Sequence, residues 1–195
     1  YLKIGDSITI ERSNDVIPRV IGINYLERDK QHVKDIEFLT VCPTCHSKLE
    51  EVYPQHFCPN IDCPDRLKGA LLHFVQRDAM NIEGLGSSII DLFVEKGYLK
   101  SIKDIYLLKR YKDEILQLEG FGEKKVEKLF NAIEESKNRE FWRVLYGLGI
   151  REVGKSMAKA LVKHFKSMEN LIAATDEELR QVEDVGDVTI KEIKS

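Results

Sequence analysis

From residue 69 onward, apolar positions recur with the period of an α-helix. After Gly122 and after Gly154 they fall at the same four offsets, namely four, seven, eight and eleven residues. These offsets place apolar side chains on one face of a helix. The pattern therefore predicts helices that begin just after a glycine, with apolar faces made of Val126, Leu129, Phe130 and Ile133 in one copy and Ala158, Leu161, Val162 and Phe165 in the other.

The glycine turn before the helix occurs four times. Its last glycines fall 36, 32 and 32 residues apart, at Gly86, Gly122, Gly154 and Gly186. The residue two positions before the last glycine is also a glycine in the first two copies, Gly84 and Gly120. In the third and fourth copies it is acidic, Glu152 and Asp184. A near-constant spacing indicates an internal repeat. We expect two double-hairpin halves about a pseudo-two-fold axis, with the fourth hairpin truncated by the end of the chain.

Further helices are predicted between the turns. Capping boxes mark two of their starts, at Ser101 with Asp104 and at Thr175 with Glu178. The single tryptophan, Trp142, has helical apolar spacing, which predicts a place in the core that joins the two halves; base stacking is the alternative.

Before residue 24 the pattern changes to that of strands. Residues 7–12 alternate between polar and apolar, and residues 19–23 form a second apolar run, with turn residues at 13–15. The segment 25–37 is charged and without a clear period. We expect a mostly α-helical chain with three parts: a β segment over 1–37, a small cysteine-containing module over 38–68, and a helical domain over 69–195.

All four cysteines lie in the second part, as Cys-x2-Cys-x12-Cys-x4-Cys at Cys42, Cys45, Cys58 and Cys63. Two close pairs of soft thiolates complete a tetrahedron around zinc, and four protein ligands leave no position for a catalytic water. The spacing therefore predicts a structural zinc site. The alternatives are two disulfides in an oxidising compartment, or a nearby histidine in place of one cysteine.

Net charge limits how the chain could bind nucleic acid. At −3 it is not a general polycation, so binding has to be local. A helix entered through a glycine turn offers unpaired N–H groups and a positive dipole end, and we expect glycines such as Gly122 to have positive φ there. Ordinary glycine-capped helices and solvated lysines are the alternative for these turns and for the basic cluster Lys124, Lys125, Lys128, Lys155 and Lys159.

The pattern of four turns resembles the helix-hairpin-helix motif of proteins that bind DNA without regard to sequence. The resemblance implies contacts with the sugar-phosphate backbone from the minor groove. It assigns DNA binding to Gly84, Gly86, Gly120, Gly122, Lys124, Lys125, Gly154, Lys155 and Gly186. Glu152 and Asp184 depart from the motif, so the third and fourth hairpins are expected to bind less tightly.

Nearly the whole chain also resembles bacterial NAD-dependent DNA ligases. Arg12 to Pro18 is similar to the family's Arg-Ala-Gly-Asp/Glu-Val-Ile-Pro at the end of its OB-fold barrel, with Ser13 and Asn14 replacing Ala-Gly. The resemblance implies that Arg12, Val16 and Ile17 engage nicked DNA. The cysteine segments, Cys-Pro-x-Cys and Cys-x4-Cys-Pro, also match the family.

These ligases seal nicks with NAD as the adenylate donor. The family's Lys-x-Asp-Gly adenylation motif does not occur in these residues, so we expect no catalytic residue here, and NAD and Mg²⁺ only in upstream domains. The expected cofactor is structural zinc, and the expected partner is nicked double-stranded DNA bound by a monomer. Without a membrane-length apolar run or a signal peptide, the expected location is the bacterial cytoplasm, at the nucleoid.

Two other functions fit parts of the sequence. A repair nuclease or branch-processing complex also uses tandem hairpins, but lacks the barrel edge at Arg12 and this cysteine module. A zinc-stabilised protein-interaction scaffold would suit the acidic net charge. Affinity for nicked duplex over a salt series separates the scaffold from both DNA-binding alternatives.

Overall fold

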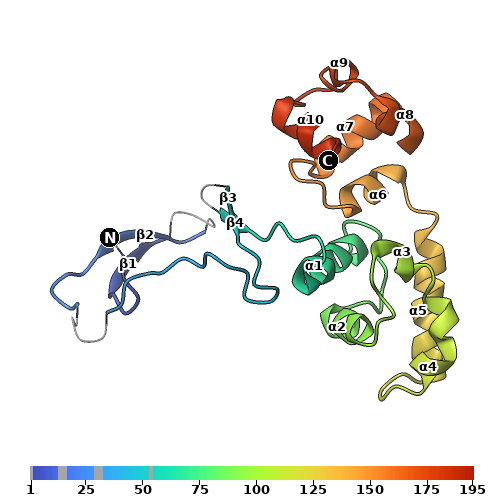
Figure 1. Ribbon diagram of the computed structural model, residues 1–195, viewed down its shortest axis with the longest axis horizontal. Coiled ribbons are helices and arrows are strands. Elements are labelled where there is room, and N and C mark those ends of the chain that lie inside the picture. The colour runs from blue at the N-terminus through green and yellow to red at the C-terminus, as the bar shows by residue number, and fades with distance from the viewer. Residues whose placement is uncertain (1, 13–16, 29–32, 53–54) are drawn as a thin grey trace. The chain divides into compact units, whose positions relative to one another are not determined.

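The computed structural model describes residues 2–12, 17–28, 33–52 and 55–195 (Figure 1). It divides the chain into two compact units, Tyr1–Pro59 and Asn60–Ser195. The mostly helical fold class is confirmed, with ten α-helices and two two-stranded sheets in the described residues. The domain limits remain a prediction; the one at residue 68 falls inside the first helix, α1 (Pro64–Val75).

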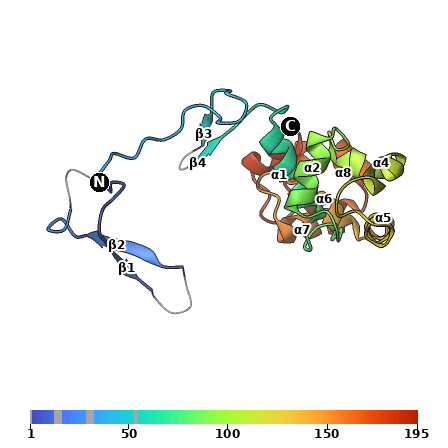
Figure 2. The same cartoon turned by 90° about the horizontal axis from the view of Figure 1, so that it is seen from below.

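The first unit contains both sheets. β1 (Ile8–Glu11) pairs antiparallel with β2 (Arg19–Ile23), with an irregularity between Thr9 and Ile10, and β3 (Glu50–Val52) pairs with β4 (Gln55–Phe57) (Figure 2). Both predicted strands therefore form, and the turn predicted at 13–15 lies outside the described residues.

The alternation before residue 24 predicted a half-buried sheet, but β1 is exposed along its length. Ile10 and Val20, which face each other across the pair, are both exposed. The reason is that two strands have too little surface to bury a face against each other. In the described residues, the OB-fold assignment of this unit therefore remains a prediction.

A bidentate ion pair in the first unit joins the segment after β2 to the segment before β1. The Arg28 guanidinium donates through Nε to Asp6 Oδ1 at 2.6 Å and through Nη2 to Oδ2 at 2.7 Å. The backbone N–H of Lys3 also donates to Oδ2 at 2.7 Å. The Asp6 side chain is 1% exposed. The hydrogen bonds from Arg28 lower the pKa of Asp6 despite its burial, which acts in the opposite direction.

The second unit contains all the helices of the described residues. After α1 come nine α-helices and a 3-10 helix: α2 (Ser87–Glu95), α3 (Ile102–Ile105), η1 (Leu108–Tyr111), α4 (Lys112–Leu116), α5 (Glu123–Ser136), α6 (Phe141–Gly147), α7 (Lys155–Phe165), α8 (Met168–Ala173), α9 (Asp176–Leu179) and α10 (Asp187–Ile193). Among the described residues, no helix has both the length and the apolar character that a membrane crossing needs.

These helices bury two separate hydrophobic cores. The first extends from Leu71 to Ile133 and includes Phe93, while the second extends from Leu145 to Ile190. Each core contains two glycine turns, as the predicted duplication requires. α6 lies between the two groups of helices (Figure 1), with Val144 against the first core and Leu145 in the second.

Trp142 was predicted to join these cores, but it is not among the residues of either and is half-buried. Its neighbours Val144, Leu145 and Tyr146 pack against the two cores, whereas its own ring remains at the surface. His73 packs between two helices: its Nε2 lies 2.8 Å from the carbonyl oxygen of Tyr146, which joins α1 to α6. Gln76 lies 2.9 Å from the other ring nitrogen.

One of the two predicted capping boxes is complete. At α9, the Glu178 N–H donates to Thr175 Oγ1 and the Thr175 N–H donates to the Glu178 carboxylate. At α3 the Ser101 side chain caps no backbone N–H. It donates instead to Asp104 Oδ2 at 3.0 Å, and the same carboxylate oxygen accepts the backbone N–H of Lys100 at 3.0 Å.

Candidate nucleic-acid interface and metal centre

The four turns share one backbone conformation. The residue two before the last glycine has positive φ in each copy: 97° at Gly84, 77° at Gly120, 62° at Glu152 and 64° at Asp184. The residue after it donates its N–H to the carbonyl three residues earlier, at 3.1 to 3.5 Å. A type II β-turn has this hydrogen bond and requires positive φ at this position. The repeat is therefore preserved in the backbone even where glycine is not.

The last glycine of each turn is instead the N-cap of the following helix. Gly86, Gly122, Gly154 and Gly186 have φ of −74°, −77°, −76° and −103°. The expectation of positive φ at Gly122 is therefore wrong, because the chain reverses at Gly120. An N-cap residue adopts the extended region, which any residue can reach.

Space, rather than conformation, distinguishes these N-cap glycines. At all four, no atom lies within 4 Å of the position that a Cβ would take. Neither the backbone nor the packing of the chain requires a glycine there. The missing Cβ leaves room for an outside group to approach the first N–H groups of α2, α5, α7 and α10, which have no partner within the helix.

Each turn is anchored by the apolar residue between its two key positions. These residues are buried in one of the two cores: Leu85 and Phe121 in the first, Val153 and Val185 in the second. Burial fixes the orientation of the turn relative to its helix, so each N-terminus stays open toward solvent. The third and fourth turns carry an acidic residue two positions before the N-cap, Glu152 and Asp184, and a negative charge so close in sequence disfavours an anion at that helix N-terminus.

The predicted lysines of the second hairpin differ in their contacts. Lys125 Nζ donates to the carbonyl oxygen of Gly120 at 3.1 Å and lies 4.1 Å from the Phe121 ring centroid. Lys125 therefore supports the turn itself. Lys124, in the first turn of α5, is exposed. Of the two, Lys124 is better placed to meet an outside phosphate.

Two of the other three predicted lysines have partners near the first hairpin. Lys155 Nζ lies 2.5 Å from Asp78 Oδ2, and Lys128 Nζ lies 3.0 Å from Glu83 Oε2. The hydrogen bond from Lys155 lowers the pKa of Asp78. Sequence reasoning missed both carboxylates, because single acidic residues in polar loops carry no local signal.

The contacts in the structure do not test the three residues that the ligase resemblance assigned to DNA binding, Arg12, Val16 and Ile17. Arg12 is exposed and Ile17 is 86% exposed in the first unit. Val16 lies outside the described residues. Their role in binding nicked DNA remains a prediction.

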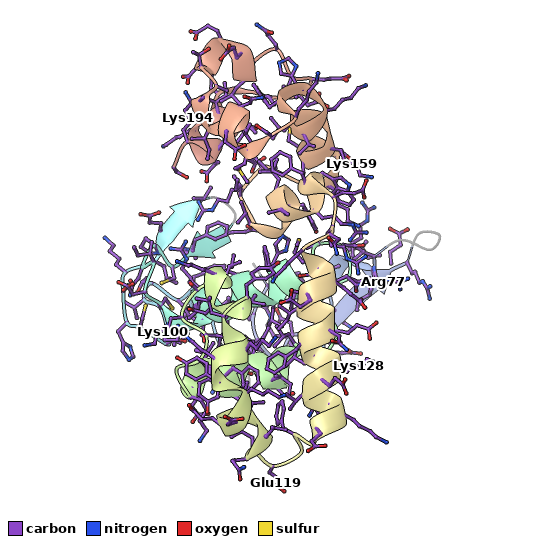
Figure 3. All side chains as sticks on the ribbon, turned by 90° about the vertical axis from the view of Figure 1, so that its right-hand side faces the viewer. Arg77, Lys100, Glu119, Lys128, Lys159 and Lys194 are labelled. Carbon is purple, nitrogen blue, oxygen red and sulfur yellow. The ribbon has the colours of Figure 1, made fainter. Side chains whose placement is uncertain are left out.

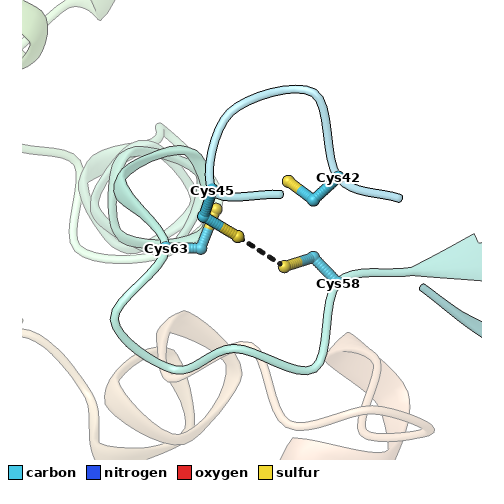
Figure 4. A group of neighbouring side chains, drawn as sticks. All are labelled: Cys42, Cys45, Cys58 and Cys63. Carbon is cyan, nitrogen blue, oxygen red and sulfur yellow. Dashed lines mark hydrogen bonds between the residues drawn. The ribbon is translucent and has the colours of Figure 1, made fainter. Parts of the chain in front are cut away.

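The four cysteines are brought together (Figure 4). All their sulfur atoms lie within 4.8 Å of one another, and Cys45 Sγ and Cys58 Sγ are 3.4 Å apart. Sulfurs at the corners of a tetrahedron with zinc bonds of 2.3 Å are about 3.8 Å apart. The cluster therefore has the dimensions of a tetrahedral metal site, with Cys42 and Cys63 buried.

Local structure presents each sulfur. Cys42 opens a tight turn in which the His46 N–H donates to its carbonyl at 2.9 Å, and Cys58 follows β4. Cys63 is the N-cap of α1, and Pro64 at the first helical position fixes the start of that helix. The disulfide alternative is not supported, since none of the four is disulfide-bonded in the structure.

Neither histidine belongs to this group of ligand atoms among the described residues. The ring of His56 stacks on Phe38 instead, with centroids 5.8 Å apart. The four-cysteine set is therefore complete without a histidine.

Comparison with known proteins follows the same division. Residues 77–135 match a family model described as a SAM-like helix-hairpin-helix tandem, and residues 143–195 match one described as a helix-hairpin-helix motif. Proteins named DNA ligase are similar over almost the whole chain. Those of Christiangramia forsetii, Fusobacterium nucleatum and Thermomicrobium roseum are 41%, 41% and 45% identical over 189, 194 and 187 residues.

The chain is homologous to a segment of DNA ligases. These matches cover 95%, 98% and 95% of the chain, but only 28%, 28% and 26% of the three relatives. The predicted tandem of helix-hairpin-helix motifs is confirmed, and the two family matches correspond to the two buried cores.

Proposed function

We propose that this chain is the DNA-binding portion of an NAD-dependent DNA ligase and that it clamps duplex DNA at a nick. The observation that carries the proposal is the shared geometry of the four turns. Each presents a helix N-terminus beside a position where a Cβ would meet no atom. Homology to a segment of DNA ligases supports DNA as the ligand.

The turns would bind phosphate groups rather than bases. Backbone N–H groups and a helix dipole favour an anion but cannot distinguish base edges, so binding is expected to be independent of DNA sequence. Lys124 and Lys155 add local positive charge to a chain with a net charge of −3. The second hairpin has glycine at both key positions, Gly120 and Gly122, and is therefore expected to bind phosphate more tightly than the third or fourth.

The cysteine cluster would hold zinc as a structural ion. Four thiolates fill the coordination shell, so the ion would supply binding energy to the fold and no catalysis. The segment 42–63 contributes only Cys42 and Cys63 to the buried apolar residues in the part of the chain that is described. Metal binding would therefore provide much of the local folding energy.

The chemistry of sealing would belong to other parts of the parent protein. These 195 residues contain no Lys-x-Asp-Gly segment, the adenylation motif of the family. We therefore assign NAD and Mg²⁺ to domains outside this segment, and we expect this chain alone to bind nicked DNA as a monomer without sealing it. Its expected location is the bacterial cytoplasm.

Fluorescence anisotropy with labelled nicked duplexes of unrelated sequence tests the proposal. Binding should fall steeply as salt rises, because phosphate contacts release counterions. Unlabelled duplexes of different sequence should compete equally. Absence of binding at low salt, which a protein-interaction scaffold would give, would refute the proposal, as would a strong preference for one sequence.

A further inference from the structure

The single tryptophan lies at the surface between two cations. Lys159 Nζ is 4.6 Å from the Trp142 ring centroid, and Arg143 Cζ is 4.9 Å from it. The ring is half-buried and lies outside both hydrophobic cores. A large aromatic side chain that packs in no core, and is flanked by cations, is suited to contact a nucleic-acid strand.

Direct contacts extend this surface to the loop before the first hairpin. Arg143 Nη1 donates to the carbonyl oxygens of Arg77 and Ala79, at 3.0 and 2.7 Å. Lys155, four residues before Lys159 on α7, pairs with Asp78 in the same loop. We name this connected surface the α6–α7 patch, which consists of Arg77, Trp142, Arg143, Lys155 and Lys159.

The patch carries a local excess of positive charge. Its four cations face two carboxylates, Asp78 at Lys155 and Glu140, whose Oε2 is 4.0 Å from Arg143 Nε. Arg143 is committed to backbone carbonyls, whereas Arg77 and Lys159 are exposed. Figure 3 shows Arg77, Lys128 and Lys159 along one edge of the second unit, with Lys100 on the opposite edge.

The patch is also continuous with one of the phosphate-binding turns. Lys155 is the first residue of α7, directly after Gly154, and Lys159 lies one helical turn further along. From there the patch passes over α6 to the loop that leads into the first hairpin. The patch therefore connects the first hairpin with the third, where Glu152 is expected to lower the affinity for phosphate.

We propose that the α6–α7 patch is a second DNA contact, separate from the glycine turns. Arg77 and Lys159 bind phosphates of the duplex backbone, and Trp142 packs against the sugars between them. This inference rests on the proposed DNA-binding function. It assigns a role to Arg77, Trp142 and Lys159, which the helix-hairpin-helix resemblance did not assign to DNA binding.

Trp142 is the only tryptophan, so its fluorescence reports directly on this surface. Nicked duplex is added to the zinc-loaded 195-residue chain, and labelled-DNA anisotropy and tryptophan emission are recorded in parallel. We expect the emission to change over the same DNA concentrations as the anisotropy. A phosphate that draws Lys159 from the ring alters the environment of the indole.

Charge variants complete the test. Lys159→Gln and Arg77→Gln should each reduce the slope of log affinity against log salt by about 1, since each removes one phosphate contact. The control Lys100→Gln makes the same change of charge on the opposite edge and should leave the slope unchanged. Because all three side chains are exposed, the variants are expected to fold like the parent, and circular dichroism checks this.

The outcomes separate this inference from the proposed function. If anisotropy shows binding while tryptophan emission stays constant, and Lys159→Gln behaves like Lys100→Gln, the patch is not a DNA contact and the proposed function stands. If anisotropy shows no binding at low salt, both are refuted.

Discussion

At the scale of single residues, the two key positions of each turn have different tasks. The first position sets the reversal of the chain, with positive φ in all four copies. The last glycine sets the approach to the helix, where a Cβ would meet no atom of the protein. Substitutions at the two positions should therefore separate stability from DNA binding.

Gly122→Asp should weaken DNA binding without weakening the fold. Gly122 is the N-cap of α5 with φ −77°, a position where aspartate is favoured, so stability should be unchanged or higher by a few tenths of a kcal/mol. The carboxylate would displace a phosphate and its charge-assisted hydrogen bond, worth about 1.5–3 kcal/mol, which is roughly tenfold or more in Kd. Thermal melts and anisotropy measure the two effects. Unchanged affinity would contradict the role of this turn; Gly122→Ala is the control without charge.

Glu152→Gly should raise both the stability of the fold and the affinity for DNA. Glu152 has φ 62°, which costs a residue with a Cβ about 1–2 kcal/mol. Glycine relieves that strain and removes a negative charge beside the third helix N-terminus, so both the melting temperature and the DNA affinity should rise. Glu152→Gln keeps the strain and removes the charge, so it should improve affinity alone. A Gly variant that melts below the parent would show that the side chain stabilises this turn.

At the scale of elements, ion pairs join segments that are distant in sequence. In the first unit, Arg28 after β2 holds Asp6 before β1. In the second unit, Lys155 on α7 holds Asp78 in the loop after α1. Both carboxyl groups have lowered pKa values because of the hydrogen bonds from these cations.

The Asp6 pair should make the first unit sensitive to acid. Since the folded pKa lies below the ordinary value of 3.8, the carboxylate contributes stability that is fully present above that value. The contribution is lost as the pH falls through the lowered folded pKa. NMR titration of the Asp6 carboxyl should give a midpoint below 3.8, and Asp6→Asn should remove the dependence. A midpoint at or above the ordinary value would show that the pair does not form in solution.

At the scale of the whole molecule, the metal site and the helical cores are separate sources of stability. No cysteine belongs to either helical core in the described residues. The four sulfurs instead gather around a volume that fits one ion. Removal of metal should therefore affect the segment 42–63 far more than the helices.

Metal analysis should find one zinc per chain in protein purified without added zinc. A strong chelator should expose four titratable thiols while most of the helical circular dichroism remains, because zinc supplies folding energy only where it binds. Cys58→Ser should weaken metal retention, whereas the control Ser88→Ala, at an exposed position on α2, should not. A folded chain with four free thiols and no metal would contradict the zinc assignment.

The sequence by itself determined the features that depend on neighbours in the chain. Apolar period predicted the helices after each glycine turn, and the spacing of Cys42, Cys45, Cys58 and Cys63 predicted their assembly. Both signals are local, since a helix face and a ligand pair are set within a few residues.

Only the tertiary structure decided the features that depend on packing between distant segments. It placed Asp78 against Lys155 and left Trp142 between Arg143 and Lys159, outside both cores. It also showed that Gly120, not Gly122, has positive φ, because the hydrogen bond from Phe121 to Leu118 sets where the chain reverses. Ion-pair partners and the exposed side of a helix depend on which elements pack together. A periodic pattern describes one element at a time, so it cannot predict them.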